Sequence, residues 1–422
     1  MAKRILEIGK DILIGLLALA IVVLTLLALP ARTVASVPWL AAALRPVAPL
    51  FGMSQSELAY AGGTVDNEQP GAAQPVAISV HPSAGRMSAQ YDFGALDTAF
   101  EQLGGYLAQA LDSAEGGNKV SEQAVCRALR STSAAFRYPA ATDPALAAAW
   151  LRADTAELPA AQWYILSVED GAVALYLVGD GCYRAQTQLS AQALETALGD
   201  YRPDGSFFAF EDETGAYDLA EDLSLILPSA QPKEVLSVNP CEARFLAALA
   251  TRLDLNPYGD AKYVDSSGTT FFTETTHTLR ITAGGRLTLQ VNELSDRFSA
   301  AASSDESRVE AARELLASIT SGALGDARLY FTGLQETAAG TVCEFAYYLN
   351  GIPVASLEPA RVTFSGTQIT QVSMTLRTLQ LTAQSAALLP PAQAAAILKA
   401  GQLLTLQYTE QEEGVLRAAW KG

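Results

Sequence analysis

The segment WYILSVEDGAVALYLVGDGCYRAQTQL, residues 163–189, carries the strongest fold signal in the chain. Three apolar stretches, at 163–168, 172–177 and 182–186, are separated by Asp170-Gly171 and Asp180-Gly181. Asp-Gly pairs favour two-residue hairpin turns, because both residues tolerate a positive φ. The segment therefore predicts three antiparallel strands joined by tight turns.

Helices are predicted on both sides of this meander. At 93–114, one helical face carries Leu96, Phe100, Leu103 and Leu107. Further predicted helices begin at Ser121 and at Asp143-Pro144, and another spans 190–198.

A similar order of helices and short strands follows in the middle and at the end of the chain. The predicted middle elements are strands at 234–238, 261–264, 269–274, 276–282 and 286–292, with helices at 241–253 and 304–318. The last hundred residues predict strands at 327–333, 341–349, 352–354, 362–364, 367–381, 403–409 and 415–420, and a helix at 391–398.

Helices alternating with antiparallel meanders indicate the α+β class and argue against a doubly wound parallel sheet. We expect two or three modules after the N-terminal region. Their predicted bounds are 75–230 for an N-terminal domain, 231–322 for a central domain and 323–422 for a C-terminal domain.

The N-terminal region predicts a membrane anchor. Residues 12–29, ILIGLLALAIVVLTLLAL, form an uncharged run that as a helix would reach about 27 Å, close to the thickness of a bilayer core. Lys3, Arg4 and Lys10 precede it, so the positive-inside rule places the N-terminus in the cytoplasm and the chain beyond Pro30 outside.

We therefore expect a cytoplasmic tail and single transmembrane helix over 1–35, followed by a juxtamembrane stalk and linker over 36–74. A cleaved signal peptide is the alternative, although Thr33-Val34-Ala35 is a poor cleavage site and the apolar run is long for a signal peptide. A buried core helix is a further alternative, which the basic flanks disfavour.

Composition excludes two classes of protein. Half of the 422 residues are hydrophobic, which excludes a disordered chain. The net charge is −17, and residues 1–35 contribute +2, so the remaining chain carries −19. This surplus of carboxylates argues against nucleic acid as the main ligand.

No catalytic, cofactor or metal motif is present in the sequence. The cysteines, Cys126, Cys182, Cys241 and Cys343, form no CxxC pair and are expected to be buried and unpaired, with a disulfide as the alternative. His81 and His277 are expected to be surface or half-buried strand residues. The acidic stretch at 211–222 lacks the order of a calcium loop, and nucleotide-binding and nucleophile-elbow motifs do not occur. The sequence predicts no enzyme and no cofactor.

Three stretches resemble a known family. WYILSVEDGAVALYLVGDGCYRAQTQLSAQAL (163–194) and NPYGDAKYVDSSGTTFFTETTHTLRITAGGRLTLQV (256–291) resemble the central strands of YycH-type proteins. Residues 328–379 are similar to the C-terminal domain shared by YycH and YycI, and LLPPAQAAAIL (388–398) and VLRAAW (415–420) fit its late helix and last strand. The Pro-interrupted stretch at 36–58 departs from that pattern.

The resemblance implies a membrane-anchored accessory protein of a WalK-type (YycG) sensor histidine kinase in Gram-positive bacteria, which tunes signalling in cell-wall homeostasis. Its implied partners are that kinase and a second YycH/YycI-type protein. Small residues permit close helix packing in membranes, so we expect Gly15, Ala18, Val22 and Thr25 to contact a partner helix.

Two other functions remain open at this point. One is an anchored envelope protein that binds or scaffolds wall components or secreted peptides. The other is an anchored hydrolase, which would require a catalytic cluster for which the sequence shows no motif. A defined ligand held in a concave pocket favours the envelope protein, whereas a solid core with an extended interface favours the kinase regulator.

Overall fold

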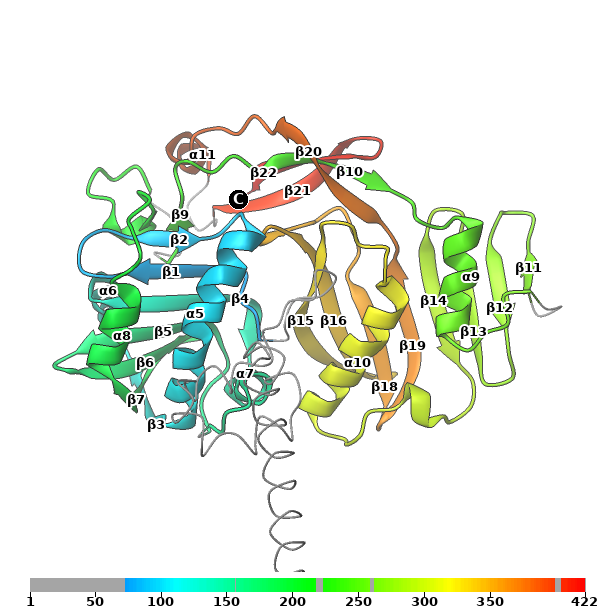
Figure 1. Ribbon diagram of the computed structural model, residues 1–422, viewed down its shortest axis with the longest axis horizontal. Coiled ribbons are helices and arrows are strands. Elements are labelled where there is room, and N and C mark those ends of the chain that lie inside the picture. The colour runs from blue at the N-terminus through cyan, green and yellow to red at the C-terminus, as the bar shows by residue number, and fades with distance from the viewer. Residues whose placement is uncertain (1–72, 156, 218–222, 259–261, 399–403, 422) are drawn as a thin grey trace, which may run out of the picture.

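A computed structural model describes residues 73–155, 157–217, 223–258, 262–398 and 404–421. Two lobes built on large sheets lie side by side, and a smaller sheet lies across one end of both (Figure 1). Every pairing between the named strands is antiparallel, which confirms the α+β class with antiparallel sheets. Within the described residues, no helix is both long and apolar enough to cross a membrane. The predicted span at 12–29 lies outside them.

The first lobe contains a seven-stranded sheet in the order β2-β1-β4-β5-β6-β7-β3. Its strands are β1 (Ala77–His81), β2 (Met87–Ala89), β3 (Glu115–Val120), β4 (Ser133–Thr142), β5 (Ala161–Glu169), β6 (Ala172–Val178) and β7 (Cys182–Ser190). Its helices are α5 (Phe93–Asp112), α6 (Glu122–Arg130), α7 (Pro144–Leu151) and α8 (Ala191–Leu198). The predicted meander forms the β5-β6-β7 centre of this sheet, with Asp170 and Gly171 both at positive φ in the first turn.

Alternation along β5 divides the core of this lobe into two layers. Tyr164 and Leu166 pack in the main core with α5, whereas Trp163 and Ile165 point to the other face, where α6 packs. The predicted helix starts are confirmed, because the side chains of Asp92, Ser121, Asp143 and Ser190 each accept a hydrogen bond from a first-turn N–H.

A short segment covers part of the α6 face. It contains β8 (Phe207–Phe208), the 3-10 helix η3 (Ala209–Glu211) and β9 (Leu225–Ile226). Phe208 is fully buried against Trp163 at a ring-centroid distance of 5.6 Å.

The second lobe contains a nine-stranded sheet in the order β11-β12-β13-β14-β19-β18-β16-β15, with β17 paired to β16. Its strands are β11 (Lys262–Val264), β12 (Thr270–Thr273), β13 (His277–Ile281), β14 (Arg286–Val291), β15 (Arg328–Thr337), β16 (Gly340–Leu349), β17 (Ile352–Pro353), β18 (Ala360–Ser365) and β19 (Gln368–Thr375). Helices α9 (Ala243–Arg252) and α10 (Asp305–Thr320) and the 3-10 helix η4 (Asp296–Phe298) accompany it. Both α-helices lie on one face of the sheet (Figure 1).

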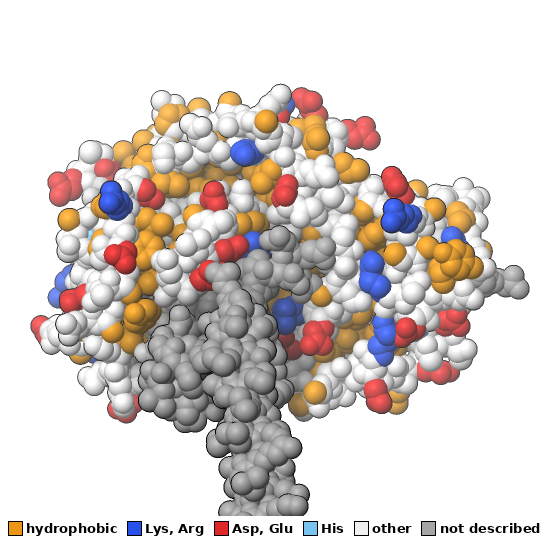
Figure 2. Space-filling view, in the orientation of Figure 1, with side chains coloured by type: hydrophobic (Ala, Val, Ile, Leu, Met, Phe, Trp, Pro, Cys, Tyr) orange, Lys and Arg blue, Asp and Glu red, His pale blue; other side chains and the backbone are white. Residues whose placement is uncertain are grey.

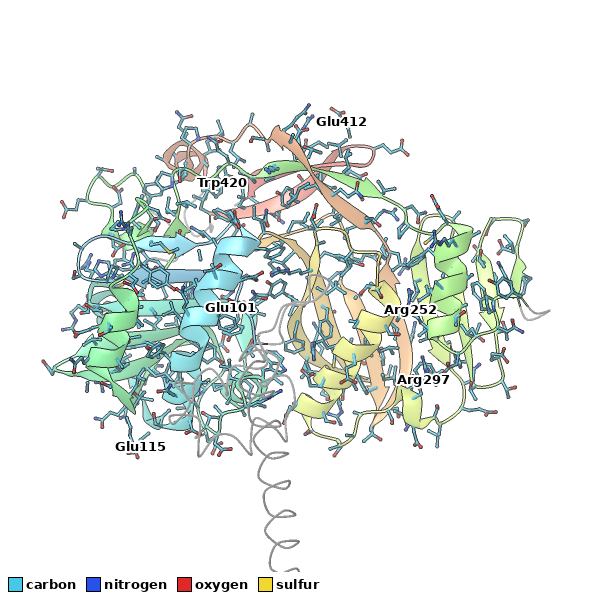
Figure 3. The ribbon with its side chains drawn as sticks, viewed as in Figure 1. Glu101, Glu115, Arg252, Arg297, Glu412 and Trp420 are labelled. Atoms are coloured by element: carbon cyan, nitrogen blue, oxygen red, sulfur yellow. The ribbon has the colours of Figure 1, made fainter. Side chains whose placement is uncertain are left out.

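Arginine side chains tie these helices to each other and to the neighbouring loop. Arg252 Nε donates to Ser318 O at 2.8 Å, which joins α9 to α10. Arg297 pairs with Asp254 and donates to the Arg252 carbonyl oxygen. Figure 3 places Arg252 and Arg297 at the seam between the two helices and η4.

The small sheet has the order β20-β10-β22-β21 and joins distant parts of the chain. Its strands are β10 (Lys233–Val238), β20 (Thr378–Ser385), β21 (Thr405–Glu412) and β22 (Val415–Lys421), and α11 (Pro391–Ile397) lies beside it. Trp420 Nε1 donates to Leu389 O at 2.8 Å, which holds the last strand against the loop that precedes α11 (Figure 3). Strands of segments 231–322 and 323–422 thus pair with each other in both the small sheet and the nine-stranded sheet.

Three expectations about strands need correction. Strands β3 and β4 were not predicted, although β4 lies in the middle of the first sheet. The predicted single strand at 367–381 is two strands, because the chain leaves the nine-stranded sheet at Leu376-Arg377 and enters the small one. Neighbouring residues of a strand are expected to face opposite sides of the sheet, so that one of a pair is exposed, but Tyr347 and Tyr348 are both buried because β16 runs into the junction between the lobes.

Candidate functional site

The two lobes meet at a buried bidentate ion pair. Arg328 at the start of β15 donates from both terminal nitrogens to the two carboxylate oxygens of Asp97 on α5, each at 2.8 Å. The Arg328 side chain is only 7% exposed, and its guanidinium lies 3.9 Å from the ring centroid of Phe93. Burial opposes the charge of Arg328, but the hydrogen bonds to Asp97 hold its pKa above the ordinary value. The pair fixes β15 against α5.

A tight turn of the second lobe inserts into the first beside this pair. Asn350 and Gly351 both have positive φ, and Asn350 Oδ1 accepts a hydrogen bond from Phe93 N at 3.1 Å. A Cβ at Gly351 would lie 2.4 Å from Val76 O, so only glycine permits this close approach. The turn that joins the strands predicted at 341–349 and 352–354 is therefore also a contact between lobes.

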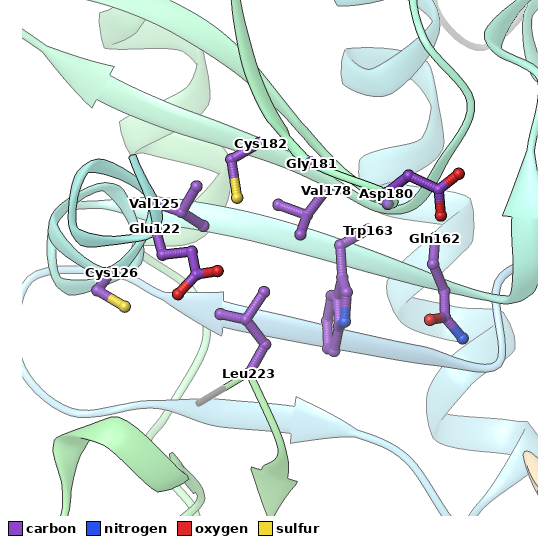
Figure 4. Close-up of a pocket in the computed structure, with 11 residues that line it drawn as sticks. Glu122, Val125, Cys126, Gln162, Trp163, Val178, Asp180, Gly181, Cys182 and Leu223 are labelled. Atoms are coloured by element: carbon purple, nitrogen blue, oxygen red, sulfur yellow. The ribbon is translucent and has the colours of Figure 1, made fainter. Parts of the chain in front are cut away.

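The outer face of the first sheet is hollowed beside Trp163. A cavity of about 220 Å³ is lined by that indole, Gln162 and Leu223, with Glu122 and Cys126 of α6 at its other end (Figure 4). Asp180 of the β6–β7 turn and Cys182 also line it. Two carboxylates and two thiols thus line it together with apolar side chains.

A second cavity lies on the opposite side of Trp163 and shares Gln162, Trp163 and Leu223 with the first. Its volume is about 180 Å³, and its walls come from both lobes and the small sheet, including Arg137 of β4, Tyr348 of β16 and Leu406 of β21. Among the described residues that line it, Arg137 is the one basic side chain, and none is acidic.

In the part of the chain that the structure describes, no helix packs on the second face of the nine-stranded sheet. Buried and partly exposed residues alternate along its strands, and α9 and α10 pack on the buried side. The opposite side presents a row of residues in direct register across seven strands. This row, which we call the open face, consists of Tyr263, Phe271, Arg280, Thr288, Ser373, Arg361 and Glu344.

Aromatic and charged groups gather at one end of the open face. Tyr263 and Phe271 stack with ring centroids 4.6 Å apart, and Arg280 lies 5.8 Å from the Phe271 centroid. Tyr263 is 53% exposed. Elsewhere, on the face visible in Figure 2, acidic and basic side chains are interspersed and form no patch of a single sign.

The potentially reactive side chains have structural roles. Among the described residues, Cys182, Cys241 and Cys343 form no disulfide, and Cys182 and Cys343 are buried. His277 is only 3% exposed, and its ring nitrogens lie 2.7 Å from Leu253 O and from Thr276 Oγ1. The expectation of a surface or half-buried His277 was therefore wrong, because this ring joins β13 to the end of α9. His81 is half-buried, and burial, followed by the charge of Arg86, lowers its pKa.

The acidic stretch is only in part a solvated loop. Glu211 pairs with the buried Arg86, whose Nη2 lies 2.6 Å from Glu211 Oε1. The part of the chain that the structure describes contains no group of three or more His, Cys, Asp or Glu side chains that could hold a metal ion.

The residues predicted to contact a partner helix, Gly15, Ala18, Val22 and Thr25, lie outside the described residues. The cavities beside Trp163 and the open face were not predicted, because each is assembled from strands far apart in sequence. The chain matches no protein-family profile, no curated protein and no solved structure.

Proposed function

We propose that this protein is a membrane-anchored extracytoplasmic regulator that binds a WalK-type sensor histidine kinase and modulates its signalling in cell-wall homeostasis. The N-terminus is cytoplasmic, residues 12–29 cross the cell membrane once, and the α+β body lies outside. A second protein of the YycH/YycI type is a further partner. The kinase assignment rests on the resemblance of the strand segments to YycH and YycI.

The open face is the structural observation that supports a binding role. A face of seven registered strands that no helix of the described residues covers offers a broad surface, whose Thr, Ser, Arg and Glu side chains suit a polar protein interface. The stacked Tyr263 and Phe271 beside Arg280 combine the residue types that dominate interface energies. The cavities at Trp163, by contrast, are each smaller than an ordinary ligand pocket of roughly 300 Å³ or more.

The test is to crosslink the full-length protein in intact cells and identify what is captured with it. We expect a sensor histidine kinase, lost when residues 12–29 are replaced by an unrelated span. Arg280→Glu on the open face should weaken the capture as well, because it reverses a charge beside the aromatic pair. Arg202→Glu, an exposed site in the first lobe, is the matched control and should have no effect.

An envelope protein that binds a small ligand is the second candidate. The observation that favours it is the cavity at Arg137, which is walled by both lobes. Capture of cell-wall enzymes with no kinase would favour this function over kinase regulation.

A further inference from the structure

The buried and half-buried arginines of the first lobe and the junction differ in the partners of their guanidinium groups. Arg86 donates to Glu211, Ser79 Oγ and Leu129 O, and Arg328 donates to Asp97. Among the hydrogen bonds and ion pairs of the described residues, by contrast, none involves the guanidinium of Arg137. Its Nε is buried without any partner. In a chain with 45 acidic and 28 basic side chains, this cation is left without a carboxylate.

The surroundings of Arg137 do not neutralise its charge. Its guanidinium lies 5.9 Å from the Trp163 ring centroid, and Tyr91 and Tyr348 line the same cavity. Burial raises the pKa of both phenols, so they stay protonated near pH 7 and supply no negative charge. A buried guanidinium donor without a hydrogen-bond partner lowers the stability of the folded protein. An anion bound in the cavity would accept that hydrogen bond and remove the cost.

The rest of the cavity wall is part apolar and part polar. Leu225, Leu404 and Leu406 line it together with Trp163. Tyr91, at its edge, has φ of +64°, a conformation that is unusual for a bulky residue and is stabilised here by the contact between lobes. A bidentate donor at one end and an apolar aromatic wall along the side match a planar carboxylate attached to an apolar body.

We propose that the cavity of Arg137 binds a small organic carboxylate with an apolar or aromatic body. The carboxylate accepts hydrogen bonds from the guanidinium, and the body packs against Trp163 and the leucines. Since the walls come from the first lobe, β16 and β21, bound ligand also stabilises the junction. This proposal does not depend on kinase regulation.

The experiment measures binding to the full-length protein in detergent by calorimetry, with three probes. Phenylacetate carries the proposed chemistry, phenylacetamide is its uncharged isostere, and inorganic phosphate is an anion without an apolar body. We expect phenylacetate to bind about tenfold or more tightly than either other probe, because only phenylacetate offers both a charge to the guanidinium and an apolar body to the wall. The thermal midpoint should rise only with phenylacetate.

Variants locate the site. Arg137→Gln should weaken phenylacetate binding about tenfold or more, whereas Arg202→Gln, at an exposed arginine of the first lobe, should bind it as the unaltered protein does. Equal binding of phenylacetate and phenylacetamide, unchanged binding to Arg137→Gln, or no saturable binding of phenylacetate up to about 10 mM would each overturn the proposal. The comparison of probes needs no variant, so it stands even if Arg137→Gln does not fold.

Discussion

Replacing Arg328 by Met should destabilise the protein strongly, because Asp97 would then be left at the lobe junction without its cation. The Asp97 side chain is 21% exposed and Arg328 7%, so solvent reaches the pair poorly. Removing one partner of a buried pair costs about 3–5 kcal/mol, since the remaining charge stays desolvated. Met keeps most of the apolar volume, which limits the loss of packing against Phe93.

The matched control is Arg286→Met. Arg286 and Glu358 form an ion pair at 3.4 Å with side chains 61% and 64% exposed. Exposed ion pairs contribute about 0–1 kcal/mol to stability, so the free energy of unfolding of this variant should be close to that of the unaltered protein. The double variant Asp97→Asn with Arg328→Met should be more stable than Arg328→Met alone, because it also removes the uncompensated charge.

Urea unfolding of the full-length protein in detergent, followed by tryptophan fluorescence, measures these differences. Trp150 of α7 packs against Phe331 of β15 at a ring-centroid distance of 5.9 Å and reports directly on the junction. A loss below about 1 kcal/mol for Arg328→Met, equal to that of Arg286→Met, would refute the reasoning that the pair holds the lobes together.

Two further predictions concern the turn at the junction and a buried thiol. Gly351→Ala should cost about 1–3 kcal/mol more than Gly366→Ala in the same unfolding assay, because both glycines have positive φ but only Gly351 lies against backbone, at Val76 O; equal losses would argue against a close contact. Burial raises the pKa of Cys343 to about 12 from an ordinary 9, so its contribution to stability is present below pH 9 and is lost as pH rises towards 12. Cys343→Ala should therefore flatten the decline of unfolding free energy over that pH range, and an unchanged slope would contradict this cause.

Local signals in the sequence were sufficient for most elements of the fold. The Asp-Gly and Asn-Gly turns and the capping residues Asp92, Ser121 and Asp143 mark their ends, because turn and cap chemistry depends on neighbouring residues alone. Strand β3 was not predicted because the residues GGNK within it are typical of a loop. Strand β4 was not predicted because its first residues, SAAF, have a weak preference for strands and because Pro139 lies within it.

Long-range pairings could not be predicted in the same way. Nothing local in β10 indicates that it pairs with β20 and β22, about 140 and 180 residues later. The unpartnered state of Arg137 is likewise a property of the assembled junction, since its neighbours come from β5, β16 and β21. The sequence around an arginine in a strand does not show whether the fold will place a carboxylate beside it.

Capture of a sensor histidine kinase by the full-length protein in cells is the most direct test of the proposed function. Crosslinking followed by mass spectrometry should recover the kinase with the unaltered protein and with Arg202→Glu. It should recover less with Arg280→Glu and none when residues 12–29 are replaced by an unrelated span. Absence of the kinase from the unaltered sample, or equal recovery from all four proteins, would contradict regulation through the membrane helix and the open face.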